Sequence, residues 1–465
     1  MALKQYESRD MECPKSPTHL AINFAGLLCS LASIIWLKYY GHLLVMDQLY
    51  IVVAGLALAV PIIVMEFIWL KPYANPSAGL NFTRSHTQHS GSFTRTLVKL
   101  LGLGVCFAFV AFIYWLFPEY RGGYYDRFFD IARYALLMLV ILALPYFYWV
   151  DRAMVAPKDS YWQLGMLCLG QAQYVNWKSI VQLLLGWTVK LFFLPLMFIY
   201  ASNNLNLIIE QDFNALWHWQ APFSARHSLN IYQFFNNFLF YIDLLFVTVG
   251  YCCTFRLFDS HIRSTEPTFL GWVVALLCYQ PFWGAVFGSL YISYSSGQDW
   301  SNHFWQSPNL HFLYAIVILA LVVIYVWASM AFGIRFSNLT HRGILTNGPF
   351  RYTKHPAYIS KNLSWWLIFM PFLVAPEFDD KIRLSLLLLL QNLVYFMRAR
   401  TEEKHLSQDP DYVAYAQFIE QKGCFAWVGS ALPILKFKPG HLFNLDEKDQ
   451  RQAHAGDAAR AKDAG

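Results

Sequence analysis

Apolar residues in this chain gather into long stretches that short polar segments separate. Ten stretches have about the length that a helix needs to cross a hydrocarbon core, roughly 20 residues. They cover residues 19–36, 50–70, 100–117, 131–150, 180–200, 231–253, 269–291, 312–332, 356–374 and 382–397. We therefore expect an all-α fold, a polytopic integral membrane helix bundle with about ten transmembrane helices.

The composition points to the same class of protein. Of the 465 residues, 57% are hydrophobic and 14% are charged, whereas soluble domains are about a quarter charged. Cysteines such as Cys106, Cys168 and Cys278 fall within or beside apolar stretches, where a thiol behaves as a small apolar side chain, so we expect no disulfides. The formal charge of +6 comes mostly from short loops and the tail, so we expect no nucleic acid partner.

Lysine and arginine are unevenly distributed over the connections between these stretches. The even-numbered connections, including residues 335–361, carry more of them than the odd-numbered connections do. Because positively charged loops stay in the cytoplasm, we expect a multi-pass protein of an inner or cell membrane with both termini cytoplasmic. Residues 335–361 and the residues after 397 should then share the cytoplasmic side.

These patterns divide the chain into four parts. Residues 1–18 form a cytoplasmic N-terminal segment, and residues 19–311 form an N-terminal transmembrane bundle to which no role can be assigned. A C-terminal domain follows over residues 312–440. Residues 441–465 have almost no bulky apolar side chain, so we expect a disordered tail.

Three ionisable residues, Glu66, Lys190 and Asp243, lie inside expected membrane helices. Such groups usually face a partner or a cavity, so Lys190 and Asp243 are candidates for a structural ion pair, with a substrate or ion pathway as the alternative. His86 and His89 have no carboxylate or cysteine nearby, and metal sites need three or four ligands. We therefore expect no metal.

The most informative polar residues flank the last two apolar stretches. The string LTNGPFRYTKHPAY covers residues 345–358, and RARTEEKHLSQDPDYVAY covers residues 398–415. The last two stretches should form a helical hairpin, which returns both strings to one side of the membrane. The two strings are therefore candidates for the two halves of one site.

Local signals place individual residues within these strings. Pro356 suits the first position of a helix, which leaves His355 at the cap and free backbone N–H groups that attract an anion. The last stretch should continue as one helix beyond Met397, so Arg398 and Glu402 share a face with Glu403 beside them. The alternative is a solvated helix end with an ion pair between Arg398 and Glu402.

Together the strings resemble the signature of the isoprenylcysteine carboxyl methyltransferase and phospholipid methyltransferase superfamily of integral membrane enzymes. The signature residues in this chain are Gly348, Pro349, Phe350, Arg351, Tyr352, His355, Pro356 and Tyr358, then Arg398, Glu402, Glu403 and Leu406, then Tyr412 and Tyr415. The resemblance covers roughly residues 312–421. Ser360 stands where the family often has glycine, and the first seven apolar stretches have no counterpart in the minimal enzymes.

The resemblance implies an S-adenosyl-L-methionine-dependent methyltransferase whose site is the C-terminal helical hairpin. The implied cofactor-binding residues are Gly348, Phe350, Arg351, Tyr352, His355, Pro356, Tyr358, Glu402 and Glu403. Arg398 would place the cofactor or the substrate, and His355 would either position the cofactor or remove a proton from an amine acceptor. The acceptor would be a membrane lipid or a lipidated molecule, and the motif does not choose among an isoprenylcysteine carboxylate, an amine headgroup lipid and a small thiol.

Two other functions stay open on the sequence alone. A membrane NADPH-dependent sterol-type reductase has a related C-terminal hairpin, although the paired glutamates and the His-Pro step argue against it. A transporter or scaffold with a vestigial methyltransferase domain is the other, and the long N-terminal part with its ionisable residues supports it.

Overall fold

The computed structural model describes residues 13–82, 93–213, 216, 224–289, 292–432 and 435–437. Within these ranges the chain is almost entirely helical, apart from the two-residue strands β1 (Ser264–Thr265) and β2 (Thr340–His341), which pair antiparallel. The all-α fold is therefore confirmed. His86, His89 and the tail over residues 441–465 lie outside the described residues.

Eight helices in the described ranges are long and apolar enough to cross a membrane. They are α1 (Leu20–Tyr40), α2 (Leu49–Met65) with the π-helical turn η3 (Glu66–Leu70), α3 (Phe93–Leu116), α4 (Asp126–Ala153), α6 (Trp177–Glu210), α8 (Ala225–Cys252), α12 (Pro308–Ala331) and α15 (Phe378–Leu406). Each coincides with one of the expected stretches, so the protein is a polytopic membrane helix bundle.

The other two expected stretches are broken into shorter helices. The helices are α9 (Phe269–Leu276) with α10 (Phe282–Val286), and α13 (Pro356–Phe369) with α14 (Pro371–Val374). Each break lies next to a proline, Pro281 or Pro371, which lacks the N–H that would continue a helix. Met370, just before Pro371, adopts left-handed backbone with φ 40°. The 14 residues of α13 span about 21 Å, less than the roughly 30 Å of a hydrocarbon core. The expectation of about ten spanning helices thus becomes eight in the described residues.

Shorter elements join these helices. The helices are α5 (Ser160–Cys168), α11 (Trp300–His303), α16 (Pro410–Lys422) and α17 (Ala426–Ala431). The 3₁₀ turns are η2 (Gly41–Leu43), η4 (Pro72–Ala74), η5 (Pro76–Ala78), η6 (Pro118–Arg121), η7 (Ala172–Tyr174), η8 (Arg256–Phe258), η9 (Gly333–Arg335) and η10 (Gly348–Arg351).

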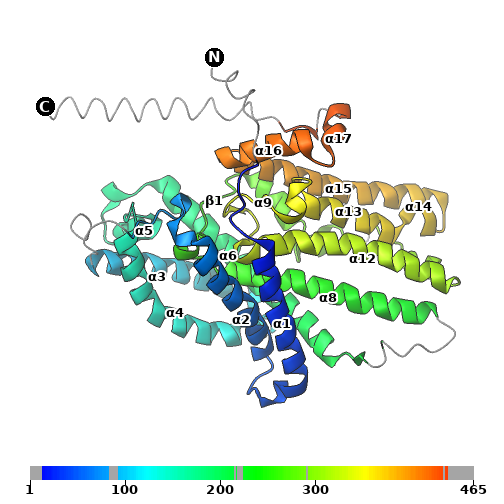
Figure 1. Ribbon diagram of the computed structural model, residues 1–465, viewed down its shortest axis with the longest axis horizontal. Coiled ribbons are helices and arrows are strands. Elements are labelled where there is room, and N and C mark those ends of the chain that lie inside the picture. The colour runs from blue at the N-terminus through cyan, green and yellow to red at the C-terminus, as the bar shows by residue number, and fades with distance from the viewer. Residues whose placement is uncertain are drawn as a thin grey trace.

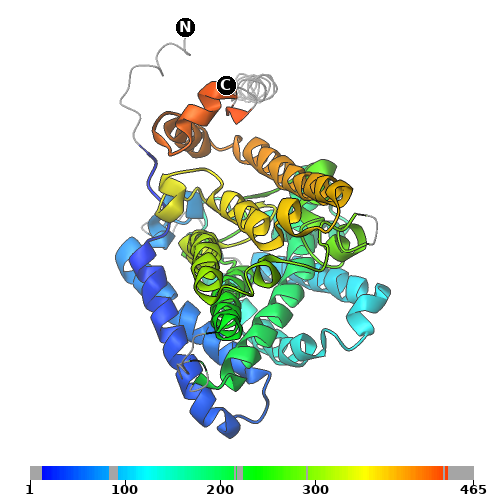
Figure 2. The same cartoon turned by 90° about the vertical axis from the view of Figure 1, so that its right-hand side faces the viewer.

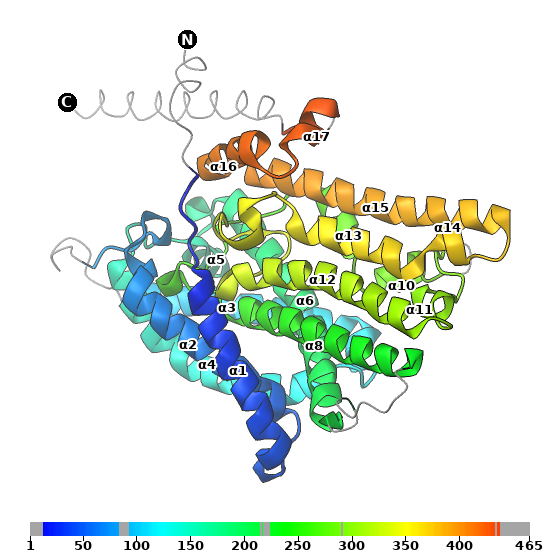
Figure 3. The same ribbon diagram turned by 45° about the vertical axis from the view of Figure 1, so that its right-hand side comes forward.

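The helices of the C-terminal half lie in layers. Helix α8 packs on α12, α12 on α13, and α13 on α15, while α16 and α17 lie beyond α15 (Figures 1 and 3). The largest apolar core joins α1, α2, α6, α8 and α12. Figure 2 shows α1 and α2 on the opposite side of the molecule from α15. Helix α4 leaves Leu137, Val140 and Ile141 exposed, as expected for a helix that faces lipid.

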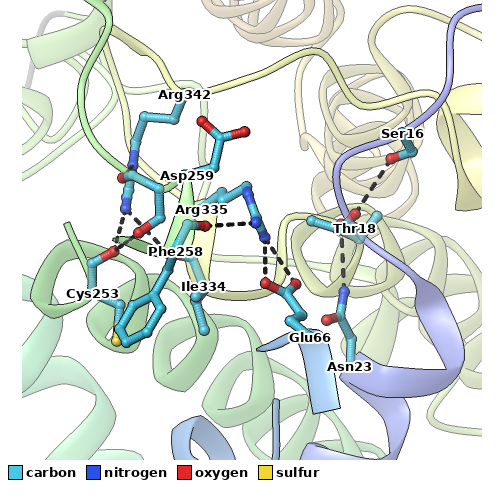
Figure 4. A network of polar contacts seen from close by, with 12 residues as sticks. Ser16, Thr18, Asn23, Glu66, Cys253, Phe258, Asp259, Ile334, Arg335 and Arg342 are labelled. Carbon is cyan, nitrogen blue, oxygen red and sulfur yellow. Dashed lines mark hydrogen bonds and ion pairs between the residues drawn. The ribbon is translucent and has the colours of Figure 1, made fainter. Parts of the chain in front are cut away.

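A buried polar network joins the N-terminal helices to the segment after α12 (Figure 4). Arg335 Nη1 donates to both carboxylate oxygens of Glu66, at 2.8 and 2.9 Å, and Nη2 donates to the carbonyl of Phe258 at 2.9 Å. Arg342 donates to five backbone carbonyls, among them those of Gly250 and Cys253 at the end of α8. The segment between α12 and α13 is therefore fixed against α2 and α8.

The residues that precede α1 pack on the same segment. Thr346 Oγ1 donates to the carbonyl of Pro14 at 2.7 Å, and Asn347 Nδ2 donates to the carbonyl of Thr18 at 2.9 Å. Cys13 packs against an apolar cluster that contains Tyr412 and Tyr415 of α16, and Figure 1 shows the chain before α1 running toward that helix. The first described residues and α16 therefore lie on one side of the bundle.

The predicted ion pair between Lys190 and Asp243 is wrong. Asp243 Oδ2 accepts from the hydroxyl of Tyr325 at 2.6 Å, while Lys190 Nζ lies 5.3 Å from the ring centre of Trp187. Spacing along the two helices does not fix how each helix is rotated, and tertiary packing turns these two side chains toward different neighbours.

Candidate active site

A cavity lies between α12, α13, α15 and the segment before α9. Its lining comes from the end of α12 and the segment that follows it, between residues 328 and 345. The start of α13 and the part of α15 between Tyr395 and Leu406 also line it. The empty space, including the part open to solvent, is about 1420 Å³.

The loop before α13 depends on a glycine. Gly348 adopts left-handed backbone with φ +57°, and a Cβ there would lie 3.3 Å from Trp327 Nε1 and 3.4 Å from the Cβ of Ala331. Gly348 begins the 3₁₀ turn η10. The turn presents Phe350 to the cavity, and the hydroxyl of Tyr415 donates to the Phe350 carbonyl at 2.7 Å.

Helix α13 begins at Pro356 with His355 at the cap, as the sequence predicts. His355 Nε2 lies 3.1 Å from Glu403 Oε1, and its ring stacks on that of Tyr358. Glu403 also forms ion pairs, with Lys354 Nζ at 2.7 Å from Oε1 and with Arg400 Nη1 at 2.9 Å from Oε2. Glu403 is thus saturated by cations of the protein and holds His355 in place.

Helix α15 runs without a break through Met397, so Arg398 and Glu402 do share a face. They do not pair with each other in the part of the chain that the structure describes. Glu402 Oε2 accepts from the hydroxyl of Tyr358 at 2.7 Å, and Arg398 Nη2 donates to Asn338 Oδ1 at 2.6 Å. The alternative of a solvated helix end with an ion pair is therefore wrong.

Arg398 is a buried cation with no carboxylate partner in the described residues. Its guanidinium lies over the rings of Tyr279, at 5.5 Å, and Tyr358, at 5.2 Å. Its partner Asn338 is fixed by two hydrogen bonds to the hydroxyl of Tyr251, at 2.9 and 3.0 Å. Arg398 therefore keeps donors for a ligand in the cavity.

Lys361 is a second cation on the cavity wall. Its Nζ lies 5.1 Å from the ring centre of Tyr325 and 5.5 Å from that of Trp365, and no hydrogen bond or ion pair joins it to another described residue. Ionisable groups at membrane depth are costly and usually face a cavity or a partner, so Lys361 is a candidate ligand contact.

Two tyrosines of α16 close the cavity on the side of the termini. Burial raises the pKa of Tyr415 above its usual value, and the nearby Cys13 and Glu402 raise it further. Burial, with Glu403 and Glu402 beside it, also raises the pKa of Tyr412. Both phenols therefore stay protonated at neutral pH; the Tyr415 hydroxyl donates to the Phe350 carbonyl, whereas the Tyr412 hydroxyl has no partner among the described residues.

The structure brings together most of the residues that the sequence selected. Phe350, His355, Pro356, Tyr358, Arg398 and Glu402 line the cavity. Gly348, Arg351, Tyr352 and Glu403 do not line it. Arg351 and Tyr352 are exposed, and Gly348 and Glu403 support the wall from behind. Direct contact of these four with a cofactor stays a prediction.

Several cavity residues were not predicted from the sequence. They are Glu266, Tyr279, Tyr325, Asn338, Lys361 and His405. His405 and Lys361 lie within the motif-bearing hairpin and could have been found as polar residues on its inner face. Glu266 and Tyr279 come from a segment without a recognisable motif, so no local signal identified them.

The fold and the cavity define a polytopic membrane protein with a cavity built largely on its C-terminal helices. Residues 310–408 of the chain match the model of the isoprenylcysteine carboxyl methyltransferase (ICMT) family. At the level of the family, this match supports a membrane methyltransferase. No curated protein and no solved structure gives a significant match.

Proposed function

We propose that this protein transfers the methyl group of S-adenosyl-L-methionine to a lipidic or lipid-modified acceptor. The observation that carries the proposal is that the family match, over residues 310–408, falls on the helices that form the cavity. Three signature residues from two helices, Tyr358, Arg398 and Glu402, line that cavity together.

The residues present suit a zwitterionic nucleoside cofactor. Glu402 keeps one oxygen without a hydrogen bond to another described residue, and a carboxylate binds an ammonium or a hydroxyl strongly. Arg398 and Lys361 provide cationic donors on the same cavity wall. When bound, S-adenosyl-L-methionine supplies an electrophilic methyl group, whose transfer forms a bond to the acceptor and leaves the electron pair of the broken C–S bond on sulfur.

The protein then has to align the acceptor and exclude water, and both effects lower the barrier to transfer. Tyr358 and Glu402 would orient the cofactor through their 2.7 Å hydrogen bond. Arg398 would hold the acceptor or the cofactor near the reacting methyl. His355, held by Glu403, would position the cofactor and would accept a proton only from an amine acceptor.

The cavity mouth is proposed to face the cytoplasm, with both termini on that side of an inner or cell membrane. The distribution of Lys and Arg over the connections supports this orientation. The packing of Cys13 against α16 also supports it, because it places both ends of the described chain on one side. A hydrophobic acceptor would enter from the bilayer, and it is either an isoprenylcysteine-like carboxylate or an amine headgroup lipid.

Glu402→Gln tests the site, because it removes the carboxylate charge and keeps the shape. Membranes that contain the full-length protein and methyl-labelled S-adenosyl-L-methionine should label a lipid or lipidated product, which mass spectrometry identifies. The variant should lose about 100-fold in initial rate, a typical effect of removing one charged site interaction. Glu377→Gln, at an exposed position before α15, is the matched control and should keep the full rate.

The same preparations separate the alternatives. S-adenosylhomocysteine should raise the melting temperature of the wild type, and NADPH should not. Unaltered labelling by Glu402→Gln would overturn the site assignment. Stabilisation by NADPH alone would replace the methyltransferase proposal with the reductase.

A further inference from the structure

One wall of the cavity comes from residues outside the family match. Strand β1 pairs with β2, with Ser264 opposite His341 and Thr265 opposite Thr340. The next residue, Glu266, donates its backbone N–H to the carbonyl of Leu339 at 2.8 Å. These bonds hold the Glu266 backbone rigidly beside the segment after α12.

The side chain of Glu266 is aimed into the cavity with one oxygen free. The residue is 3% exposed and lines the cavity. Oε1 accepts from the N–H of Thr268 at 2.9 Å and from the Thr268 hydroxyl, whereas no described residue donates a hydrogen bond to Oε2. Gly271 makes room for this side chain, because a Cβ there would lie 2.5 Å from Glu266 Cγ. Because Glu266 lines the cavity, this oxygen is available to a hydrogen-bond donor on a ligand, and a carboxylate accepts such a bond strongly.

His405 faces the free oxygen of Glu266. Its Nε2 lies 2.9 Å from the hydroxyl of Ser264, and its Nδ1 lies 3.9 Å from Glu266 Oε2, which is too far for a hydrogen bond. When Ser264 donates to Nε2, the ring carries its proton on Nδ1. A free donor and a free acceptor then stand side by side on the cavity wall.

A hydroxyl group satisfies both atoms at once. Its hydrogen can go to Glu266 Oε2 while its oxygen accepts from His405 Nδ1. An oxygen about 2.8 Å from each atom closes a triangle whose third side is the observed 3.9 Å. Ammonium groups lack the acceptor and carboxylates lack the donor, so neither satisfies both atoms.

We propose that Glu266 and His405 bind a ribose hydroxyl of the cofactor, which makes the segment before α9 part of the nucleoside site. This inference rests on the proposed function. Acidic side chains bind ribose hydroxyls in dinucleotide-binding folds for the same chemical reason. Glu402 precedes His405 by three positions on α15, and both side chains line the cavity. One face of this helix would therefore present both residues to the cofactor.

The test compares S-adenosylhomocysteine with its 2′-deoxy and 3′-deoxy analogues, by calorimetry on the purified full-length protein in detergent. The wild type should bind one deoxy analogue about tenfold more weakly or worse, because a hydrogen bond to a charged group is lost. Glu266→Gln should bind S-adenosylhomocysteine about tenfold more weakly and should no longer distinguish it from that analogue. Glu119→Gln, at an exposed position in η6, should behave as the wild type.

His405 gives a second, independent pair of variants. His405→Ala should also lose the discrimination between hydroxyl and deoxy ligands. His405→Asn should restore part of it, because the amide nitrogen can replace Nδ1 as the donor. The melting temperature without ligand reports whether each variant is folded, and the His405 pair decides the question if Glu266→Gln does not fold.

The outcomes separate this inference from the proposed function. If the wild type binds S-adenosylhomocysteine but the folded Glu266 and His405 variants keep the full deoxy penalty, only the ribose assignment is overturned. If the wild type binds neither S-adenosylhomocysteine nor its analogues, the methyltransferase proposal is overturned and the ribose assignment falls with it.

Discussion

The N-terminal bundle contains clusters of paired buried charge, whereas two cations of the C-terminal cavity form no ion pair with a described residue. In the bundle, Lys99 Nζ lies 2.8 Å from Asp151 Oδ1 and 3.4 Å from Asp159 Oδ2, and Arg95 also bonds to Asp151. At the boundary, Arg335 pairs with Glu66. In these groups nearly all the charge is neutralised within the protein.

The cavity wall also has paired charges, such as Lys354 with Glu403, but Arg398 and Lys361 form no ion pair with a described residue. Arg398 has a neutral partner, Asn338, and Lys361 has aromatic rings around it and interacts electrostatically with the nearby carboxylate of Asp243. Breaking a buried ion pair destabilises a fold, and a buried charge without a pair is costly and usually faces a partner or a cavity. The comparison indicates that the paired charges of the bundle are structural and that Arg398 and Lys361 of the cavity serve binding.

The largest expected effect concerns Arg398. Arg398→Gln can keep a hydrogen bond to Asn338 but loses the charge, so methyl transfer should fall by about 100- to 1,000-fold. The melting temperature should stay close to that of the wild type, because no described carboxylate loses its partner. Rates at saturating S-adenosyl-L-methionine and thermal unfolding in detergent measure the two effects.

Arg400→Gln is the control from the same helix. Arg400 binds Glu403 at 2.9 Å, is partly exposed and does not line the cavity. It should keep most of the activity. Equal loss of activity in both variants, or a large loss of stability in Arg398→Gln, would remove the contrast between the unpaired cations of the cavity and the paired charges of the bundle.

The next effect concerns the buried ion pair of Glu66 and Arg335. Both side chains are 1% exposed, so Glu66→Gln leaves a guanidinium without its carboxylate and should destabilise the protein by about 3–5 kcal/mol. Chemical unfolding in detergent measures this change. Replacing both residues by Met should recover part of the loss, because no unpaired charge then remains.

An exposed pair provides the comparison for this prediction. Arg383 and Asp380 form an ion pair near the start of α15, with both side chains substantially exposed. Asp380→Asn should therefore change stability by less than about 1 kcal/mol. If Glu66→Gln kept the stability of the wild type but altered ligand binding, Glu66 would belong to the site rather than to the scaffold.

Most of the fold and the motif half of the site could be predicted from local signals. Long apolar runs identified the stretches that contain the eight spanning helices, because such runs are nearly always helical in a membrane. Pro356 marked the start of α13 and placed His355 at its cap. The hairpin then brought His355 and Glu403 to within 3.1 Å, as the positions of the two strings required.

The remaining features depend on tertiary packing. Ser264 and His405 are 141 positions apart and meet only because β1 pairs with β2 beside α15. The breaks near Pro281 and Pro371 occur within apolar runs whose composition alone predicts continuous spans. For the same reason, the sequence assigned Asp243 to Lys190, whereas packing gives it Tyr325.

The smallest effect concerns His261, in the loop between η8 and β1, where the two regions meet. Burial, together with the nearby charges of Arg256, Arg263 and Arg342, lowers its pKa to about 3. Asp259 Oδ1 is 4.0 Å away but already accepts from Arg263 at 3.2 Å, so it does not offset these cations. The imidazole is therefore neutral in the folded protein at neutral pH.

The unfolded chain takes up a proton at this histidine near pH 6.5, which the folded protein does not do. The contribution of neutral His261 to the free energy of unfolding is thus complete above pH 6.5, and it is lost as the pH falls toward about 3. Between pH 7.5 and pH 5.5 the loss should be about 1 kcal/mol. His261→Gln does not titrate, so its free energy of unfolding, measured beside that of the wild type at both pH values, isolates this effect. A difference between the two proteins that does not change with pH would mean that His261 takes up its proton equally in the folded and the unfolded protein, so that Asp259 offsets the neighbouring cations.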